Sequence, residues 1–314
     1  MDLVSPVDSR LAELSHRSAR VSKRQANLLN FLAAPCRSRF RDELGLVLRV
    51  GIVVLSCAVT FAGAGSIPFQ SDEVMDYEVR WKPPLFLMPS VRAGLTTLRV
   101  HPQTTYDGRP AFQFAATVKS DGFFTRLGGI HVNDAFDSIV SADNFCARKI
   151  VKVQREGSRQ RDVVITFDPE KKTTRVVETN VALSPPRITR DETLPLADCV
   201  VDILSIFYAA RRLDLEVGKS FDLLLSDNGT TRPVTITVQG REPVETARGT
   251  VSAVRIHTGS AMGLFSRGGV FVVWYSDDEL KIPVRFEASV RFGKIFGWLT
   301  SYQGSGKLKI DDRR

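Results

Sequence analysis

Histidine is scarce in this chain of 314 residues, and the patterns in which enzymes use it are missing. Four histidines occur, and only His101, His131 and His257 lie beyond the first 64 residues. Their wide spacing forms no zinc-ligand pattern. The serine elbow Gly-x-Ser-x-Gly is absent as well. The sequence therefore predicts no metal site and no cofactor, and it contains no catalytic signature.

Clustered positive charge is also lacking, although the net charge is +8. Residues 1–64 hold nine Lys or Arg and five Asp or Glu, which leaves 34 basic and 30 acidic residues for the other 250. A protein that binds nucleic acid gathers its cations on one face. The dispersed charge therefore argues against a nucleic-acid partner.

Long hydrophobic runs are limited to residues 50–64, which carry no charge. Arginines crowd the residues just before this run, and a small-x-small triplet closes it at Ala64. This order is typical of a secretory signal. We predict that residues 1–64 are a cytoplasmic n-region plus signal peptide, cleaved after Ala64, with the rest of the chain periplasmic or secreted. The alternative is an inner-membrane anchor at residues 44–64; in both cases only this segment meets the membrane.

Cysteine is rare too, with four in the chain. Cys36 and Cys57 lie in the N-terminal segment, so only Cys146 and Cys199 remain in the exported part. An even pair in an oxidising compartment can form a disulfide. The alternative is that both are small buried hydrophobic residues.

What the sequence does contain is a two-residue alternation of apolar and polar side chains. In residues 283–292, Val284, Phe286 and Ala288 share one face, and Arg285 and Glu287 share the other. Such alternation indicates a half-buried antiparallel strand. Eleven further segments between residues 74 and 275 show it, with turn formers between them. We therefore expect residues 65–314 to be one mainly β domain: a curved antiparallel meander, resembling a half-barrel, barrel or sandwich.

One segment breaks this rhythm. Residues 198–213 lack Gly and Pro and place apolar residues at helical spacing, with Arg211 and Arg212 at the end. We predict an apolar helix there, packed against the sheet, after a crossing loop at residues 183–196. A faint similarity between Gly-Phe-Phe and Gly-Leu-Phe segments adds the alternative of two related halves, 72–190 and 215–310, joined by this helix.

Aromatic residues supply the candidate binding site. A curved sheet closed by an apolar helix can hold an acyl chain, although the same aromatic residues also suit an ordinary core. The candidate lining residues are Phe207, Tyr208, Phe271, Trp274 and Phe286. The candidate residues of a polar cleft are His131, Asp134, Asp137, Asp277 and Asp278, whose acidic members are also typical of soluble turns and edges.

Several short motifs in collinear order over about residues 72–303 resemble the domain-of-unknown-function 3108 family. In the C-terminal half they are Val217-Gly-Lys-Ser-Phe221, Val234-x-Ile-x-Val-x-Gly-Arg-Glu242, Gly249-Thr250, Gly263-Leu-Phe265, Val273-Trp-x-Ser-Asp-Asp-Glu279 and Ile282-Pro-Val-Arg285. In the N-terminal half they are Tyr77-Glu-Val-x-Trp81, Ala93-Gly94, Lys119-Ser-x-Gly-Phe-Phe124 and Asp137. The resemblance implies an exported bacterial protein and supplies no catalytic residues.

Three functions remain open at this point. The first is non-enzymatic binding of a lipid or another apolar ligand in envelope maintenance, with a lipid, a lipoprotein or another envelope protein as partner. The second is an envelope hydrolase whose acidic residues converge in a cleft. The third is a structural or partner-docking module, which would show neither an apolar site nor a polar cleft.

Overall fold

The computed structural model describes residues 68–84, 89–122, 131–258, 271–290 and 293–310. The predicted signal at residues 1–64, its cleavage site at Ala64 and the alternative anchor lie outside the described residues. The glycine-rich segments that suggested two related halves also fall mostly outside them. The described part of the chain begins at residue 68 and ends at residue 310.

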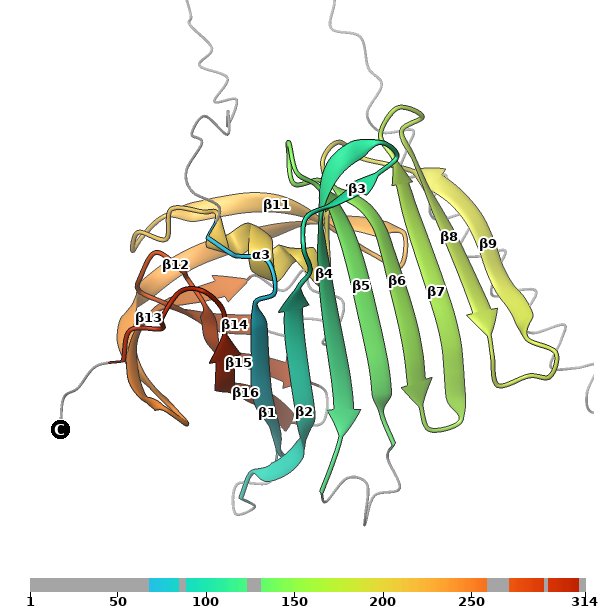
Figure 1. The fold of residues 1–314 in the computed structure, drawn as a ribbon. Coiled ribbons are helices and arrows are strands. Elements are labelled where there is room, and N and C mark those ends of the chain that lie inside the picture. The colour runs from blue at the N-terminus through green and yellow to red at the C-terminus, as the bar shows by residue number, and fades with distance from the viewer. Residues whose placement is uncertain (1–67, 85–88, 123–130, 259–270, 291–292, 311–314) are drawn as a thin grey trace, which may run out of the picture. The chain divides into compact units, whose positions relative to one another are not determined.

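This part contains sixteen strands and one helix (Figure 1). The elements are β1 (Val74–Lys82), β2 (Val91–Val100), β3 (Thr104–Tyr106), β4 (Arg109–Ser120), β5 (Asn133–Ser141), β6 (Ala147–Glu156), β7 (Arg159–Asp168), β8 (Thr173–Asn180), β9 (Arg187–Pro195), β10 (Val201–Asp202), α3 (Ser205–Arg211), β11 (Ser220–Asp227), β12 (Thr230–Thr246), β13 (Gly249–Thr258), β14 (Phe271–Ser276), β15 (Pro283–Val290) and β16 (Gly293–Gln303).

All sixteen strands belong to one curved sheet that does not close. Its order runs β10-β11-β12-β13-β14-β15-β16-β1-β2-β4-β5-β6-β7-β8-β9, and β3 pairs with β4. Every pairing is antiparallel except that of β10 with β11, which is parallel. The prediction of a mainly β, curved meander is confirmed, with one parallel pair added. Because β1 lies between β16 and β2, the first and last strands of the domain join both halves into a single sheet.

Alternation along the strands determines which side chains enter the core. In β7, Val163, Ile165 and Phe167 are buried, whereas the residues between them are part-exposed. A strand with one face on the core produces this pattern. The predicted period of two is therefore the physical origin of the sheet.

The helix is shorter than predicted. The prediction of a helix over residues 198–213 was wrong in its bounds, since α3 spans only Ser205–Arg211. Val201 and Asp202 pair with β11 instead, and the Asp202 carboxylate accepts hydrogen bonds from the backbone N–H groups of Leu204 at 2.8 Å and Ser205 at 3.0 Å. These bonds satisfy N–H groups that a helix start leaves free. Val201 therefore belongs to a strand rather than to the helix.

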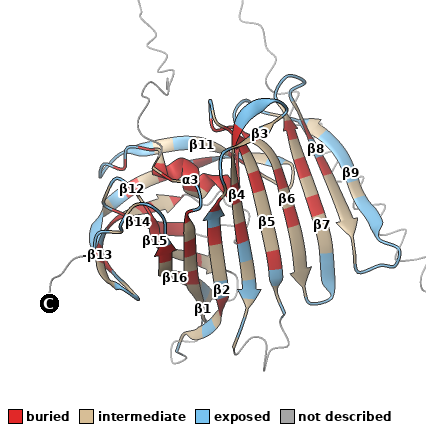
Figure 2. Cartoon of the chain, viewed as in Figure 1, coloured by how far each residue is buried: buried red, intermediate tan, exposed pale blue. Residues whose placement is uncertain are grey.

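The prediction of a crossing loop at residues 183–196 was also wrong, because β9 occupies most of it and pairs with β8. β9 is at the edge of the sheet and is exposed along most of its length, as the pale blue ribbon in Figure 2 shows. An exposed edge strand needs no buried face, so its sequence lacks apolar alternation. Charged residues and proline are common in such edges.

Helix α3 lies inside the curve of the sheet, and its buried residues appear red in Figure 2. Tyr208 stacks on Phe114 of β4, with ring centroids 3.9 Å apart. On another side of the helix, the Tyr275 hydroxyl of β14 donates a hydrogen bond of 3.1 Å to the Phe207 carbonyl. Because β4 and β14 are well separated in the strand order, these contacts confirm the predicted apolar helix packed against a curved sheet.

Candidate functional site

Three of the five predicted aromatic residues meet on the helix side of the sheet. Phe207 of α3 contacts Phe271 of β14 edge-on at 5.7 Å between ring centroids, and Phe271 lies 6.2 Å from Phe286 of β15. Gly297 of β16 faces Phe286, and a Cβ atom at this glycine would lie 2.1 Å from the phenyl ring. The glycine therefore lets the Phe286 ring lie flat against β16.

Neighbouring apolar side chains extend this cluster along β16 and β1. Ile295 pairs with Ala288, which in turn pairs with Phe271, so Ile295 shares their face. Val79 pairs with Gly297 and lies on the same face. We call Val79, Phe207, Phe271, Phe286 and Ile295 the concave apolar patch. All of them except Phe271 are part-exposed.

The structure does not bring Tyr208 and Trp274 into this patch. Tyr208 is buried on the side of the helix that stacks on β4. Trp274 lies on the face of β14 opposite Phe271, because the two are three residues apart in a strand. Its indole Nε1 donates a hydrogen bond to the Glu242 carboxylate of β12. Strand alternation was the sequence signal that could have separated Phe271 from Trp274.

A buried ion pair, which the sequence did not single out, ties the helix to the start of the domain. Both oxygens of Glu73 accept hydrogen bonds from the Arg211 guanidinium, and both side chains are 0% exposed. Arg211 also donates to the carbonyls of Leu280 at 3.0 Å and Pro68 at 2.6 Å. Glu73 directly precedes β1 in an irregular segment, so no periodic pattern marks it.

Tyrosines surround this pair and remain protonated. Burial and the nearby Glu73 carboxylate raise the pKa of Tyr302 to about 12. Burial likewise raises the pKa values of Tyr77, Tyr208 and Tyr275. Burial acts to lower the pKa of Arg211, but the hydrogen bonds from its guanidinium to Glu73 raise it and prevail. The cluster therefore holds one charge of each sign with neutral phenols around it. This arrangement indicates a structural rather than a catalytic role.

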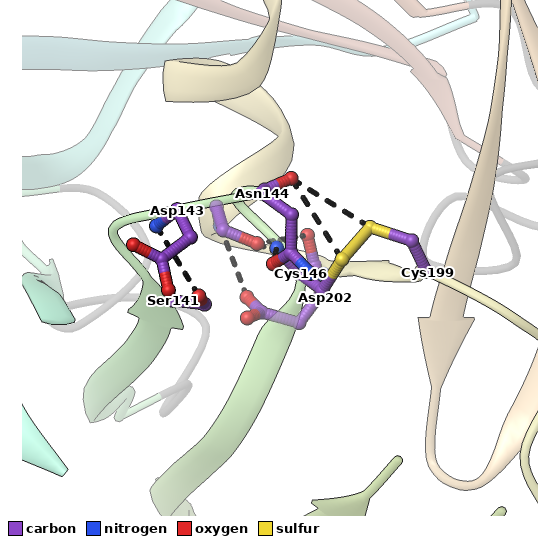
Figure 3. The surroundings of a disulfide bond; sticks show 7 residues. Ser141, Asp143, Asn144, Cys146, Cys199 and Asp202 are labelled. Atoms are coloured by element: carbon purple, nitrogen blue, oxygen red, sulfur yellow. Dashed lines mark hydrogen bonds between the residues drawn. A yellow bond between two sulfur atoms is a disulfide. The ribbon is translucent and has the colours of Figure 1, made fainter. Parts of the chain in front are cut away.

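Cys146 and Cys199 form a disulfide in the structure, with their Cα atoms 5.0 Å apart (Figure 3). It joins the start of β6 to the segment that leads into β10 and the helix. The Asn144 carbonyl lies 3.7 Å from the Cys146 sulfur and 3.8 Å from the Cys199 sulfur, as the dashed lines show. Close by, the Ser138 hydroxyl donates a hydrogen bond to the Asp202 carboxylate. The disulfide and this bond both fasten the helix entry to the sheet.

Two cavities lie near the disulfide, away from the concave apolar patch. One of about 330 Å³ is lined by Tyr106, Ser141, Thr166 and residues in or beside the β3–β4 and β7–β8 turns. The other, of about 210 Å³, is lined by the disulfide itself. Arg148 and Pro169 line both. The larger cavity is lined mostly by polar and charged side chains, whereas the smaller one also has apolar neighbours such as Leu196, Ala197 and Val200, and neither includes a residue of the patch.

The polar residues of the hydrolase alternative are not brought together. Asp134 and Asp137 lie on opposite faces of β5, where Asp134 accepts the Arg155 backbone N–H at 2.8 Å and Asp137 accepts from Gln113 at 2.7 Å. Asp277 and Asp278 follow β14, and five strands lie between β14 and β5 in the sheet. His131 is exposed and lies two residues before β5. Among the described residues, no group of three or more His, Cys, Asp or Glu could hold a metal.

Comparison with known sequences places the chain in a family. The family of proteins of unknown function DUF3108 matches residues 76–300. The chain belongs to the DUF3108 family. This confirms the resemblance seen in the sequence, and it leaves the activity open. No curated protein matches the chain.

Several solved structures share features of this DUF3108 protein at low identity. A β-barrel-like protein of the DUF1849 family from Brucella abortus is 10% identical, with a TM-score of 0.48 over 75% of this chain and 98% of its own. A Bacteroides fragilis protein assigned as exported, with a YmcC-like fold, is 8% identical, with a TM-score of 0.32 over 76% and 98%. A Parabacteroides distasonis protein assigned as a lipoprotein is 9% identical, with a TM-score of 0.31 over 74% and 96%. Identities this low carry no function over to this chain. Within the described residues, no helix has the length and apolar character needed to span a membrane.

Proposed function

We propose that this DUF3108 protein is a non-enzymatic periplasmic protein that binds the acyl chain of a lipid or lipoprotein in envelope maintenance. The observation that supports the proposal is the concave apolar patch. Its aromatic and aliphatic side chains lie on the helix side of a curved sheet, and four of its five residues are part-exposed. Scattered apolar residues on a surface need no explanation, but a contiguous group suggests a ligand or partner.

The driving force for such binding would be removal of apolar surface from water, about 25 cal/mol for each Å². An acyl chain carries no hydrogen-bonding groups, so it needs only apolar neighbours of suitable shape. Phe207, Phe286 and Ile295 offer this, and no charged residue belongs to the patch. The ion pair of Glu73 and Arg211 is fully enclosed and would not compete for the ligand.

The test uses cis-parinaric acid, a fatty acid whose fluorescence rises in apolar surroundings, with a pair of matched variants. Ile295→Gln changes the patch, and Ile139→Gln changes a part-exposed isoleucine on the opposite face of the sheet. We expect the wild-type protein to bind the probe and Ile295→Gln to bind it about 10-fold more weakly, which corresponds to about 1.4 kcal/mol. Ile139→Gln should bind like the wild type.

Equal loss of affinity in both variants would contradict the site, because it would reflect general destabilisation. A wild-type protein that does not bind the probe, and that yields no lipid when extracted and examined by mass spectrometry, would contradict the function.

A further inference from the structure

Arginine and tryptophan alternate across four neighbouring strands on the face of β14 opposite the helix. Arg255 of β13 pairs with Trp274 of β14, Trp274 pairs with Arg285 of β15, and Arg285 pairs with Trp298 of β16. We call these four residues the arginine–tryptophan ladder. Adjacent strands lie about 4.8 Å apart, so successive side chains of the ladder are in contact.

The contacts are cation–π stacks. The guanidinium carbon of Arg285 lies 4.5 Å from the Trp274 ring centroid and 5.6 Å from that of Trp298. The guanidinium carbon of Arg255 lies 5.7 Å from the Trp274 centroid on the other side. Phe296 stacks beside Trp298, with centroids 5.6 Å apart and planes inclined by 21°. The result is a continuous row of flat groups.

Stacking engages the face of a guanidinium and leaves its N–H edge available. Within the described part of the chain, the Nε atoms of Arg255 and Arg285 are buried and have no hydrogen-bond partner, so a ligand would have to meet the terminal nitrogens of these guanidinium groups. Arg285 forms only a long ion pair, 3.9 Å to Oε2 of Glu287, whose Oε1 accepts from Lys294 at 2.7 Å. A guanidinium presents five donors that match the oxygens of a carboxylate or phosphate. Arg285, whose side chain is 29% exposed, therefore keeps terminal N–H groups that an anion could reach.

The aromatic members of the ladder suit a second kind of contact. Trp274 is buried between the two guanidinium groups, whereas Trp298, Phe296 and Arg285 are part-exposed. The apolar C–H face of a sugar ring can lie on an accessible aromatic ring, and an anionic substituent on that sugar would then reach the neighbouring guanidinium.

We propose that the arginine–tryptophan ladder binds a saccharide that carries a carboxylate or phosphate, with the sugar ring on Trp298 and the anionic group on Arg285. This site shares no residue with the concave apolar patch and lies on the other face of the sheet, so it goes beyond the acyl-binding proposal. The same chemistry occurs in a free acidic oligosaccharide and in the phosphorylated sugar headgroup of a glycolipid.

The experiment is a titration followed by tryptophan fluorescence, with trigalacturonate as the free acidic saccharide and maltotriose as its uncharged counterpart. Phosphatidylcholine vesicles with and without lipid A serve as the glycolipid arm. We expect the wild type to bind trigalacturonate or the lipid A vesicles, and to bind maltotriose and plain vesicles at least about 10-fold more weakly, since charge-assisted hydrogen bonds contribute about that much. Which of the two acidic probes binds more tightly identifies the source.

The variants are Arg285→Gln and Trp298→Ala, with Arg99→Gln as a control at an exposed arginine of β2. Each ladder variant should lower affinity about 10-fold or more, and Arg99→Gln should leave it unchanged. Arg285→Lys should also lower affinity, because a lysine keeps the charge but loses the planar fork. Thermal unfolding of each variant checks that it folds, and Arg255→Gln replaces any that does not.

Three results would overturn the proposal. The wild type binds neither acidic probe; maltotriose binds as tightly as trigalacturonate; or folded ladder variants bind like the wild type. In the last case the ladder only stabilises the contacts between strands, and its substitution would change the unfolding temperature without changing binding.

Discussion

Arg211 and Arg285 both lie against aromatic rings, but their guanidinium groups have different surroundings. Arg211 is 0% exposed, lies 5.8 Å from the ring centroids of Phe69 and Tyr208, and donates to Glu73 and two backbone carbonyls. Arg285 is stacked between two indoles, its side chain is 29% exposed, and its nearest carboxylate is beyond hydrogen-bond reach. An arginine stacked on aromatic rings therefore occurs twice: Arg211 is buried with its donors paired, and Arg285 is part-exposed with donors left to solvent.

The difference shows how an arginine can be sorted into a structural or a binding group. A buried guanidinium must have its donors satisfied by the protein, because leaving them unpaired costs several kcal/mol. A part-exposed guanidinium can leave donors to water and exchange water for a ligand. The count of protein acceptors around each guanidinium, rather than its aromatic contacts, separates the two roles in this molecule.

The largest expected effect comes from breaking the buried ion pair. Arg211→Met leaves the Glu73 carboxylate buried without a partner, and we expect the free energy of unfolding to fall by about 3–5 kcal/mol. Urea denaturation followed by circular dichroism measures it. The double variant Glu73→Leu/Arg211→Met removes both charges and should recover most of the loss. If the free energy of unfolding of Arg211→Met lies within about 1 kcal/mol of that of the wild type, the ion pair is not shielded from water.

The disulfide is a second link between the sheet and the segment that leads into the helix. Its removal should lower the free energy of unfolding somewhat less. Cys146→Ala/Cys199→Ser opens a link between residues 53 apart in sequence. We expect a loss of about 2–4 kcal/mol, because the unfolded chain regains conformational freedom. Chemical denaturation of the oxidised wild type, the reduced wild type and the double variant provides the measurement. If the reduced wild type and the double variant differ markedly, the effect belongs to the substituted side chains rather than to the bond.

The part-exposed arginine should matter far less to stability. Arg285→Gln removes two cation–π contacts at a part-exposed site, so we expect the free energy of unfolding to change by about 0.5–1 kcal/mol. The same urea experiment compares it with Arg211→Met. A loss as large as that of Arg211→Met would mean that the ladder is a structural element, and the distinction drawn between the two arginines would fail.

How much of this structure the sequence predicts depends on how far apart in the chain the interacting residues lie. Alternation within a strand is local, and it was sufficient for the mainly β class and for the single face shared by Val284, Phe286 and Ala288. The bounds of α3 depend on the parallel pairing of Val201 with Leu225, a contact between distant segments. A run of apolar residues cannot distinguish a short buried strand from a helix.

The two arginine clusters also depend on long-range placement. The pairing of Glu73 with Arg211 joins residues 138 apart in sequence. The ladder requires the register of four strands, which the turns between them determine. Neither register nor the burial of an irregular segment can be read from composition. The pairing of Cys146 and Cys199 was one of two alternatives because only two cysteines remained outside the N-terminal segment.

The smallest effect concerns Asp134, a buried carboxylate that accepts one backbone hydrogen bond and lies beside the Glu156 carboxyl. Burial raises the pKa of Asp134, and the hydrogen bond from the Arg155 backbone N–H opposes this only in part. Because the folded-state pKa exceeds the unfolded value near 3.8, the folded protein binds the proton more tightly. Stability contributed by this group is therefore lost as the pH rises from about 4 through the raised pKa.

Asp134→Asn should remove that dependence, so its stability relative to the wild type should increase between about pH 4 and pH 7. Asp168 offers the opposite sign, because the hydrogen bond from Lys171 lowers the pKa of this exposed carboxyl. Asp168→Asn should lose stability relative to the wild type as the pH rises to about 4 from below, because the wild-type carboxyl ionises at lower pH in the folded than in the unfolded state. Urea denaturation at several pH values measures both slopes. If Asp134→Asn does not gain stability relative to the wild type between about pH 4 and pH 7, the surroundings of Asp134 do not penalise its charge.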